Sequence, residues 1–233
     1  MPQTISWYKN RIQEVRKNRI EALVRHNPMP SLNDLDKKLS KYLNFSNGFF
    51  IELGGNDGYT QSNTFFLEYQ KNWNGILVEG IPDLARSCEY FRIHSKVFHC
   101  ACVEFDYPDQ SITMQYAGLM SIVNGAMKSQ DLDQEHIKRG LSCQNISDSY
   151  SIQVPTRTLQ SIIDECQVDE IDFLSLDVEG FESNVLNGID FNKNAPKYIC
   201  VEARHFEDVH HILKSNYNIV EQLTHHDYMY QRK

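Results

Sequence analysis

The chain lacks a long apolar run, an excess of positive charge and any internal repeat. A membrane-spanning helix needs about 20 consecutive apolar residues, so we expect no membrane span. Nucleic-acid binding requires a basic surface, and the formal net charge of −8 predicts that nucleic acid is not a partner. The six cysteines form no C-x-x-C pair and no zinc-like spacing. We therefore expect reduced thiols in a cytoplasmic protein.

Also missing is G-x-G-x-x-G, the glycine fingerprint of dinucleotide-binding proteins. In its place stands Glu52-x-Gly54-x-x-x-Gly58, directly after the apolar residues 49–51. The apolar run predicts a buried strand, and the Gly, Asn and Asp cluster predicts a sharp turn before a helix at about 61–71. Glycines let a backbone approach a ligand, and a helix N-terminus offers free N–H groups. This spacing is typical of methyltransferases that use S-adenosylmethionine (SAM); an ordinary strand–turn–helix junction is the alternative.

Residues 1–45 predict an N-terminal helical extension. Its first helix has apolar residues at helical spacing, and Ser31 is expected to cap a second helix that starts at Leu32. The apolar residues of the first helix are Ile5, Tyr8, Ile12 and Val15. The extension could cover the ligand site, pack on the sheet edge or form a dimer contact, so a homo-oligomer stays open.

Residues 46–233 predict one α/β domain, because apolar strands and helices alternate along them, which favours a mostly parallel sheet with helices. Residues 117–150 interrupt the alternation. A long insertion in such a domain often carries contacts to a ligand, so this segment predicts either a substrate wall or a merely structural loop.

Four of the predicted strands end in a carboxylate: Glu52, Glu79, Asp177 and Glu202. The carboxyl ends of parallel strands share one edge of a sheet, where ligands bind. Clustered carboxylates repel one another unless they meet cations or hydroxyl donors. SAM supplies a sulfonium, an ammonium and a ribose diol; an exposed strand end is the alternative for any single residue. Glu79 follows the second strand after the glycine turn, where an acidic residue accepts hydrogen bonds from ribose hydroxyls.

Asp177-Val178-Glu179-Gly180 indicates where a methyl acceptor would lie. An acceptor hydroxyl is a weak nucleophile at neutral pH, so it needs a general base or a metal that lowers its pKa. His205, three residues after a strand end, is the candidate base. Asp177, Glu202 and His205 would also suit an oxygen-rich site for a divalent metal. Hydrogen bonding to the acceptor without a metal is the alternative.

The runs at 50–58, 73–79 and 171–188 resemble the FkbM family of SAM-dependent methyltransferases, and the resemblance covers about 49–230. It implies a Rossmann-like class I methyltransferase fold, with a mostly parallel seven-stranded sheet and helices on both faces. It also implies O-methylation of a hydroxyl on a sugar or glycan, or on a natural product or lipid. Gly80, where a Pro often follows the Glu, and Gly55, where Ala is commoner, depart from the family's pattern.

The resemblance also implies a division of roles among the residues. Asp177 and Glu179 would face the acceptor, whose identity does not carry over. The cofactor site would comprise Glu52, Gly54, Gly55, Asn56, Asp57, Gly58, Ser62, Asn63, Glu79, Ala101 and Cys102. A SAM-binding module without turnover is an alternative, and a nicotinamide-dependent oxidoreductase is disfavoured by the missing glycine pattern.

Overall fold

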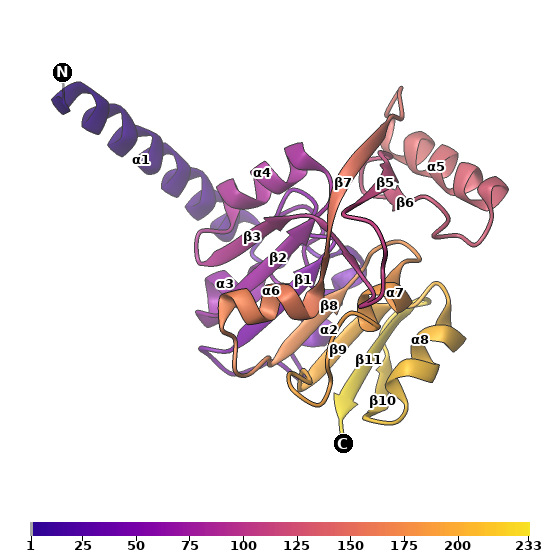
Figure 1. Ribbon diagram of the computed structural model, residues 1–233. Coiled ribbons are helices and arrows are strands. Elements are labelled where there is room, and N and C mark those ends of the chain that lie inside the picture. The colour runs from indigo at the N-terminus through magenta and orange to yellow at the C-terminus, as the bar shows by residue number, and fades with distance from the viewer. Residues whose placement is uncertain (1) are drawn as a thin grey trace.

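The computed structural model describes the backbone of residues 2–233 and the side chains from Asn10 onward. The side chains of Ile5 and Tyr8, on which the predicted apolar face of the first helix partly depends, lie outside the described residues. Two β-sheets with flanking helices form the body, and a long N-terminal helix projects from it (Figure 1). In the described part of the chain, no helix is both long and apolar enough to cross a bilayer.

The main sheet has seven strands in the order β10-β11-β9-β8-β1-β2-β3. These are β1 (Phe49–Leu53), β2 (Asn74–Glu79), β3 (Ser95–His99), β8 (Phe173–Leu176), β9 (Tyr198–Glu202), β10 (Tyr217–Gln222) and β11 (Asp227–Arg232). Strand β11 is antiparallel to both of its neighbours, and the other pairs are parallel. The predicted mostly parallel, seven-stranded sheet is therefore confirmed. The strand order reverses between β1 and β8, and ligands bind beyond the carboxyl ends at such a switch point.

Helices cover both faces of this sheet, because successive strand residues point to opposite faces and both sets are apolar. Ile51 and Ile76 belong to one core, which includes α6 (Leu159–Cys166), α7 (Glu182–Leu186) and α8 (Phe206–Leu213). Phe50 and Leu77 belong to the other, with α3 (Phe65–Lys71), α4 (Pro82–Phe91) and the helix α2 (Leu35–Leu39). The two-sided burial matches the near-continuous apolar runs of the strands.

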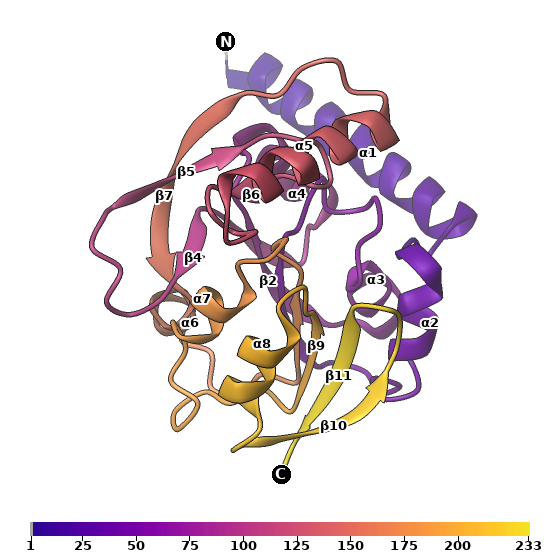
Figure 2. The same cartoon turned by 90° about the vertical axis from the view of Figure 1, so that its right-hand side faces the viewer.

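A second, four-stranded sheet was not expected from the sequence. It has the order β4-β7-β5-β6, with β4 (Ala101–Val103), β5 (Ser111–Gln115), β6 (Ile122–Val123) and β7 (Ser151–Thr158). The apolar run at 97–103 is divided between two sheets, because the chain leaves the main sheet after His99 and pairs with β7 from Ala101. We call residues 111–150, which include β5, β6 and α5 (Gln130–Gln144), the cap. In Figure 2 the cap lies at one end of the main sheet.

The N-terminal extension packs on the body at two places. Helix α1 (Pro2–His26) reaches α4, where the Arg16 guanidinium donates to the Tyr90 carbonyl at 2.6 Å. Ser31 does not cap α2, whose N-cap is Asp34; it precedes the 3-10 turn Leu32–Asp34, and its hydroxyl accepts the Asp36 N–H in the first turn of α2 at 2.6 Å. The second helix is shorter than predicted, because Asn33 at φ +56° interrupts it with a left-handed conformation. Helix α2 and the following turn join the core on the α3–α4 face, which shows that the extension packs on the sheet.

Candidate active site

A cavity of about 280 Å³ opens at the carboxyl ends of the main-sheet strands. All four carboxylates predicted to gather there line it: Glu52, Glu79, Asp177 and Glu202. Of the segment 117–150, for which the sequence left a substrate wall or a structural loop open, the first part lines the cavity through Gly118, Leu119, Ser121 and Val123, whereas 124–150 does not. Residues 32–35, before and within α2, and the β10–β11 turn at 224–227 complete the wall. The sequence left the first of these segments open and did not indicate the second.

The glycine turn after β1 requires its glycines. Gly54 has φ +80°, and a Cβ there would lie 1.9 Å from the Asp177 carbonyl oxygen. Gly58 has φ +85°, and its Cβ would lie 2.9 Å from Cα of Cys88. L-residues with side chains rarely adopt such angles. Both positions therefore require glycine for two reasons, the positive φ and the lack of space for a Cβ. The contact between Gly54 and Asp177 joins the predicted cofactor turn directly to the predicted acceptor residue.

Glu79 is a fixed acceptor at the end of β2. Its Oε2 accepts the Asn56 N–H at 2.8 Å, and its Oε1 accepts the Ile81 N–H at 2.7 Å. Burial raises the pKa of Glu79 to about 7, an effect that these backbone N–H bonds oppose. The carboxyl is 7% exposed and lies in the cavity wall, so it can accept further donors from a ligand at a defined place.

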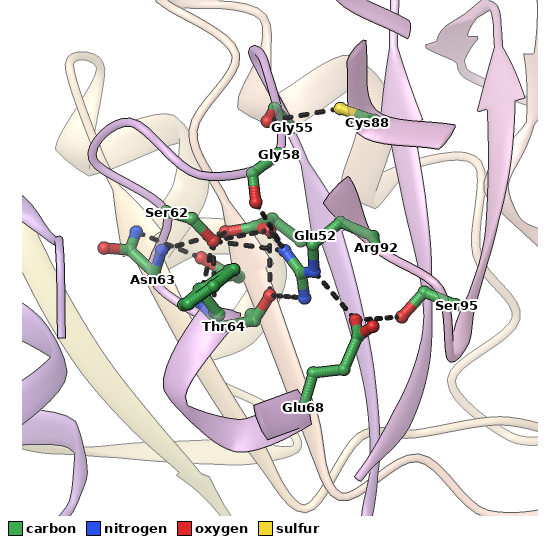
Figure 3. A network of polar contacts seen from close by, with 12 residues as sticks. Glu52, Gly55, Gly58, Ser62, Asn63, Thr64, Glu68, Cys88, Arg92 and Ser95 are labelled. Carbon is green, nitrogen blue, oxygen red and sulfur yellow. Dashed lines mark hydrogen bonds and ion pairs between the residues drawn. The ribbon is translucent and has the colours of Figure 1, made fainter. Parts of the chain in front are cut away.

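Glu52 takes part in a buried polar network centred on Arg92 (Figure 3). Arg92 donates to Glu52 Oε2 at 3.0 Å and to Glu68 Oε2 at 2.7 Å, and these side chains are at most 4% exposed. It also donates to the Thr64 hydroxyl at 2.7 Å and lies 3.4 Å from the Gly58 carbonyl. One guanidinium therefore holds the end of β1, the glycine turn and the start of α3 together.

The same network includes two residues that were predicted to bind the cofactor, Glu52 and Ser62. Glu52 accepts hydrogen bonds from the Ser62 and Thr64 hydroxyls and the Asn63 N–H. The Ser62 hydroxyl accepts the N–H of Phe65, the first residue of α3, at 3.1 Å. Glu52 and Ser62 thus fix the shape of the turn, besides lining the cavity. Arg92 was missed, because an isolated arginine in a sequence gives no sign of its partners.

Asp57 and Gly58 do not reach the cavity wall. The Asp57 carboxylate accepts the N–H groups of Tyr59 and Thr60 at 2.8 and 2.6 Å. This is an Asx turn, in which the side chain stabilises its own loop. The sequence placed both residues in the cofactor site, and the structure corrects this: they shape the loop, whereas Gly54, Gly55 and Asn56 line the cavity.

The far end of the cofactor region lies between β2 and the second sheet. Ala101 and Cys102, predicted to approach a cofactor, line the cavity and are buried. Met114 of the cap lies against Gly80, where a Cβ would come within 2.4 Å of its sulfur. The departure from the family pattern at Gly80 therefore makes room for the cap. Asn63 lines the opposite side and donates to the Ser175 hydroxyl at 3.2 Å.

Three carboxylates gather across from the glycine turn: those of Asp177, Glu179 and Glu202, with one oxygen of each within 4.8 Å of the others. The Arg204 guanidinium lies 2.6 Å from Glu179 Oε2 and 3.3 Å from Glu202 Oε1. Burial, and then the charge of Glu202, raises the pKa of Asp177 well above its usual range. Burial, and then the charge of Glu179, raises the pKa of Glu202 to about 7. The two carboxyls therefore resist being ionised together, because burial and the neighbouring carboxylate both disfavour a second negative charge.

Glu179 is held at the interface with the cap. It adopts a left-handed conformation at φ +53°. Besides Arg204, its Oε2 meets Nε2 of His136 in α5 at 3.4 Å. Burial lowers the pKa of His136 to about 4, so this contact joins a neutral imidazole to the carboxyl. The sequence assigned Glu179 to the acceptor; in the structure it also anchors the cap.

His205 does not join the cluster. Its Nε2 lies 2.8 Å from the Ala126 carbonyl oxygen of the cap, to which it donates, and its side chain is not part of the cavity wall. The predicted set of Asp177, Glu202 and His205 is therefore not assembled, and Glu179 takes the third place. The reason is the turn into α8, which directs the imidazole toward the cap segment.

Comparison with known proteins identifies one family. The model of the methyltransferase FkbM domain matches residues 52–230, and no curated protein matches the chain. The FkbM methyltransferase of Methylobacillus flagellatus KT is 14% identical with a TM-score of 0.47, over 91% of this chain and 60% of that one. A putative caffeoyl-CoA O-methyltransferase of Staphylococcus aureus is 10% identical with a TM-score of 0.46, over 97% of this chain and 99% of that one.

A third solved structure is a SAM-dependent methyltransferase of Geobacter sulfurreducens in complex with S-adenosyl-L-homocysteine (SAH), 10% identical with a TM-score of 0.39, over 87% of this chain and 72% of that one. The FkbM match runs from the last residues of β1 into β11 and so includes both the glycine turn and the carboxylate cluster. The chain belongs to the FkbM family of SAM-dependent methyltransferases.

Proposed function

We propose that the protein is an O-methyltransferase that moves the methyl group of SAM onto a hydroxyl of a sugar or glycan. The observation that carries the proposal is the pair of carboxyls Asp177 and Glu202, opposite the glycine turn in one cavity. Each has one buried oxygen without a hydrogen-bond partner in the described part of the chain. Oxygens in this position suit the recognition and deprotonation of a hydroxyl.

The cofactor would lie along the cavity from the turn to the second sheet. The backbone at Gly54–Asn56 would approach its methionine part, together with Asn63. Glu79 would accept hydrogen bonds from the ribose hydroxyls, since its carboxyl is held by two backbone N–H groups. The adenine would reach Ala101 and Cys102. Glu52 would act indirectly by holding the turn.

Methyl transfer from a sulfonium is a single in-line displacement, so positioning and proton removal supply the catalysis. The acceptor oxygen attacks the methyl carbon, the carbon–sulfur bond breaks, and the hydroxyl proton passes to the Asp177–Glu202 pair. These carboxyls share a site and titrate as a pair. SAH and the methyl ether are the products. His205 is not proposed as the base, because its Nε2 is hydrogen bonded to the cap.

A divalent cation on Asp177, Glu179 and Glu202 is the alternative way to activate the hydroxyl, since carboxylate oxygens suit Mg²⁺. The Arg204 guanidinium already contacts one oxygen of Glu179 and one of Glu202, which leaves fewer carboxylate oxygens free to bind a metal. We therefore propose proton transfer to the carboxyl pair without a metal.

The test combines binding with product analysis. Calorimetry with SAM, SAH and NAD should show binding of the first two only, and binding of NAD alone would contradict the proposal. Incubation with SAM and a panel of glycosides should yield SAH together with a methyl ether, identified by NMR. Methyl ethers formed only from lipid or natural-product alcohols would show that the acceptor is not a glycan. SAM binding without SAH production from any acceptor would favour a SAM-binding module without turnover.

A further inference from the structure

The acceptor half of the cavity is lined by more acidic than basic side chains. Four of its lining residues are acidic: Asp177, Glu179, Glu202 and Asp227. Among the described residues of the wall there is no lysine or arginine. The guanidinium of Arg204 meets Glu179 and Glu202 from outside the wall. Even with Arg204 counted, acidic groups exceed basic groups in this half of the site.

Two of these carboxylates face each other across a strand pair. Asp227 at the start of β11 is directly opposite Glu202 at the end of β9. Like charges in this position destabilise a sheet, and both residues lie in the cavity wall. Thr224 donates a hydrogen bond to Asp227, which satisfies a lone pair without neutralising the charge. A repulsive pair at a ligand site is expected where the ligand brings the opposite charge.

Two carboxyl oxygens of the site have no hydrogen-bond donor from the described part of the chain. Asp177 Oδ1 and Glu202 Oε2 are buried, and neither has a partner in the described part of the chain. A buried polar atom left without a partner costs about 1–3 kcal/mol, so a ligand that donates to these oxygens gains affinity. The sulfonium and ammonium of SAM are offset in part by its own carboxylate, so the cofactor brings one net positive charge. Its charge alone does not balance the cluster.

We propose that the acceptor carries an ammonium group close to the hydroxyl that is methylated, as an amino sugar does, and that Glu202 and Asp227 select it. This inference rests on the proposed O-methyl transfer. An ammonium supplies both the missing charge and the missing donors. An acceptor with a carboxylate or phosphate at the same place meets four acidic side chains and no cation in the described wall, and such a like-charge arrangement excludes the wrong ligand.

Binding to the SAH-loaded protein tests this without turnover. The probes are three methyl glycosides of the same ring stereochemistry that differ in one substituent: a hydroxyl, an amine or a carboxylate. In saturation-transfer NMR titrations, the affinity for the amine should be about tenfold higher than for the hydroxyl compound. The compound with the carboxylate, a uronate, should show no binding. Uronate binding equal to that of the amine overturns the inference, and so does binding of none of the three. Amine binding without formation of a methyl ether would instead contradict the proposed function alone.

The selecting residues are tested by substitution. Asp227→Asn should lower the preference for the amine over the hydroxyl compound about tenfold and leave SAH affinity unchanged. Asp169→Asn is the matched control: this aspartate is exposed, in the loop that enters β8 at the opposite edge of the main sheet. If Asp227→Asn keeps the full preference, Glu202→Gln is measured in the same way. An unchanged preference in both variants overturns the assignment.

Discussion

Replacing Arg92 by methionine should destabilise the protein severely, although its side chain is not part of the cavity wall. The substitution keeps most of the apolar stem and removes the guanidinium. It leaves Glu52 and Glu68 buried without their cation, and the Thr64 hydroxyl and the Gly58 carbonyl lose a donor. Breaking a buried ion pair by removing one partner typically costs about 3–5 kcal/mol.

The two ion pairs share one guanidinium, so their losses do not add, and we expect a loss of about 4 kcal/mol in the free energy of unfolding. For a chain of this size 1 kcal/mol shifts the melting temperature by about 2–4 °C, so melting should fall by roughly 8–16 °C. Arg92→Lys should cost about half as much, because lysine keeps the charge and loses the planar array of donors. SAH affinity should fall in parallel, since the network shapes the glycine turn.

Urea unfolding followed by circular dichroism measures the loss, and calorimetry measures SAH affinity. Arg86→Met is the matched control on the same helix: Arg86 pairs with Asp83, and both side chains are more than two-thirds exposed. An exposed pair contributes about 0–1 kcal/mol. A loss below about 1 kcal/mol for Arg92→Met, or equal losses for the two variants, would refute the role assigned to the network.

The other predictions concern the site itself. Asp177→Asn should lower turnover, measured by SAH formation, at least 100-fold. SAH affinity, measured by calorimetry, should change less than threefold. Near-normal turnover would show that Asp177 is not the base. SAH affinity should fall as the pH drops from 8 to 6, because ribose hydroxyls donate to the ionised Glu79, whose pKa burial raises to about 7. Glu79→Gln should remove that pH dependence, and a persisting dependence would contradict the ribose assignment. Dialysis against EDTA should leave turnover unchanged, and activity restored only by Mg²⁺ would show that the carboxylates bind a metal.

Local patterns were sufficient for much of the fold. The four predicted strands that end in a carboxylate are β1, β2, β8 and β9, the central strands, whose residues are mostly buried. The N-cap of α6 is a signal of the same local kind, with the Thr158 hydroxyl accepting the Ser161 N–H at 3.1 Å. Such signals depend on neighbours in sequence, which is why a single sequence contains them.

Contacts between distant segments were not predictable in the same way. Arg92 meets Glu52 across 40 positions, and His205 turns to the carbonyl of Ala126 across 79. Neither partnership leaves a periodic pattern. The convergence of the strand-end carboxylates was predictable because parallel strands share an edge, whereas the third member of the cluster depends on the turn at Glu179. The sequence therefore indicated the site and not the pairing inside it.

The way in which the cap is attached restricts how the site can be filled. A single residue separates β3 from β4, and β7 leads directly into α6. On the body side β4 and β7 pair with each other, and residues 104–110 connect β4 to the cap. Moving the cap as a unit would disturb the pairing of β5 with β7. If the cap stays in place, the ligand against the glycine turn lies deeper than the acceptor, and we expect it to bind first, which initial-rate kinetics with both substrates would test.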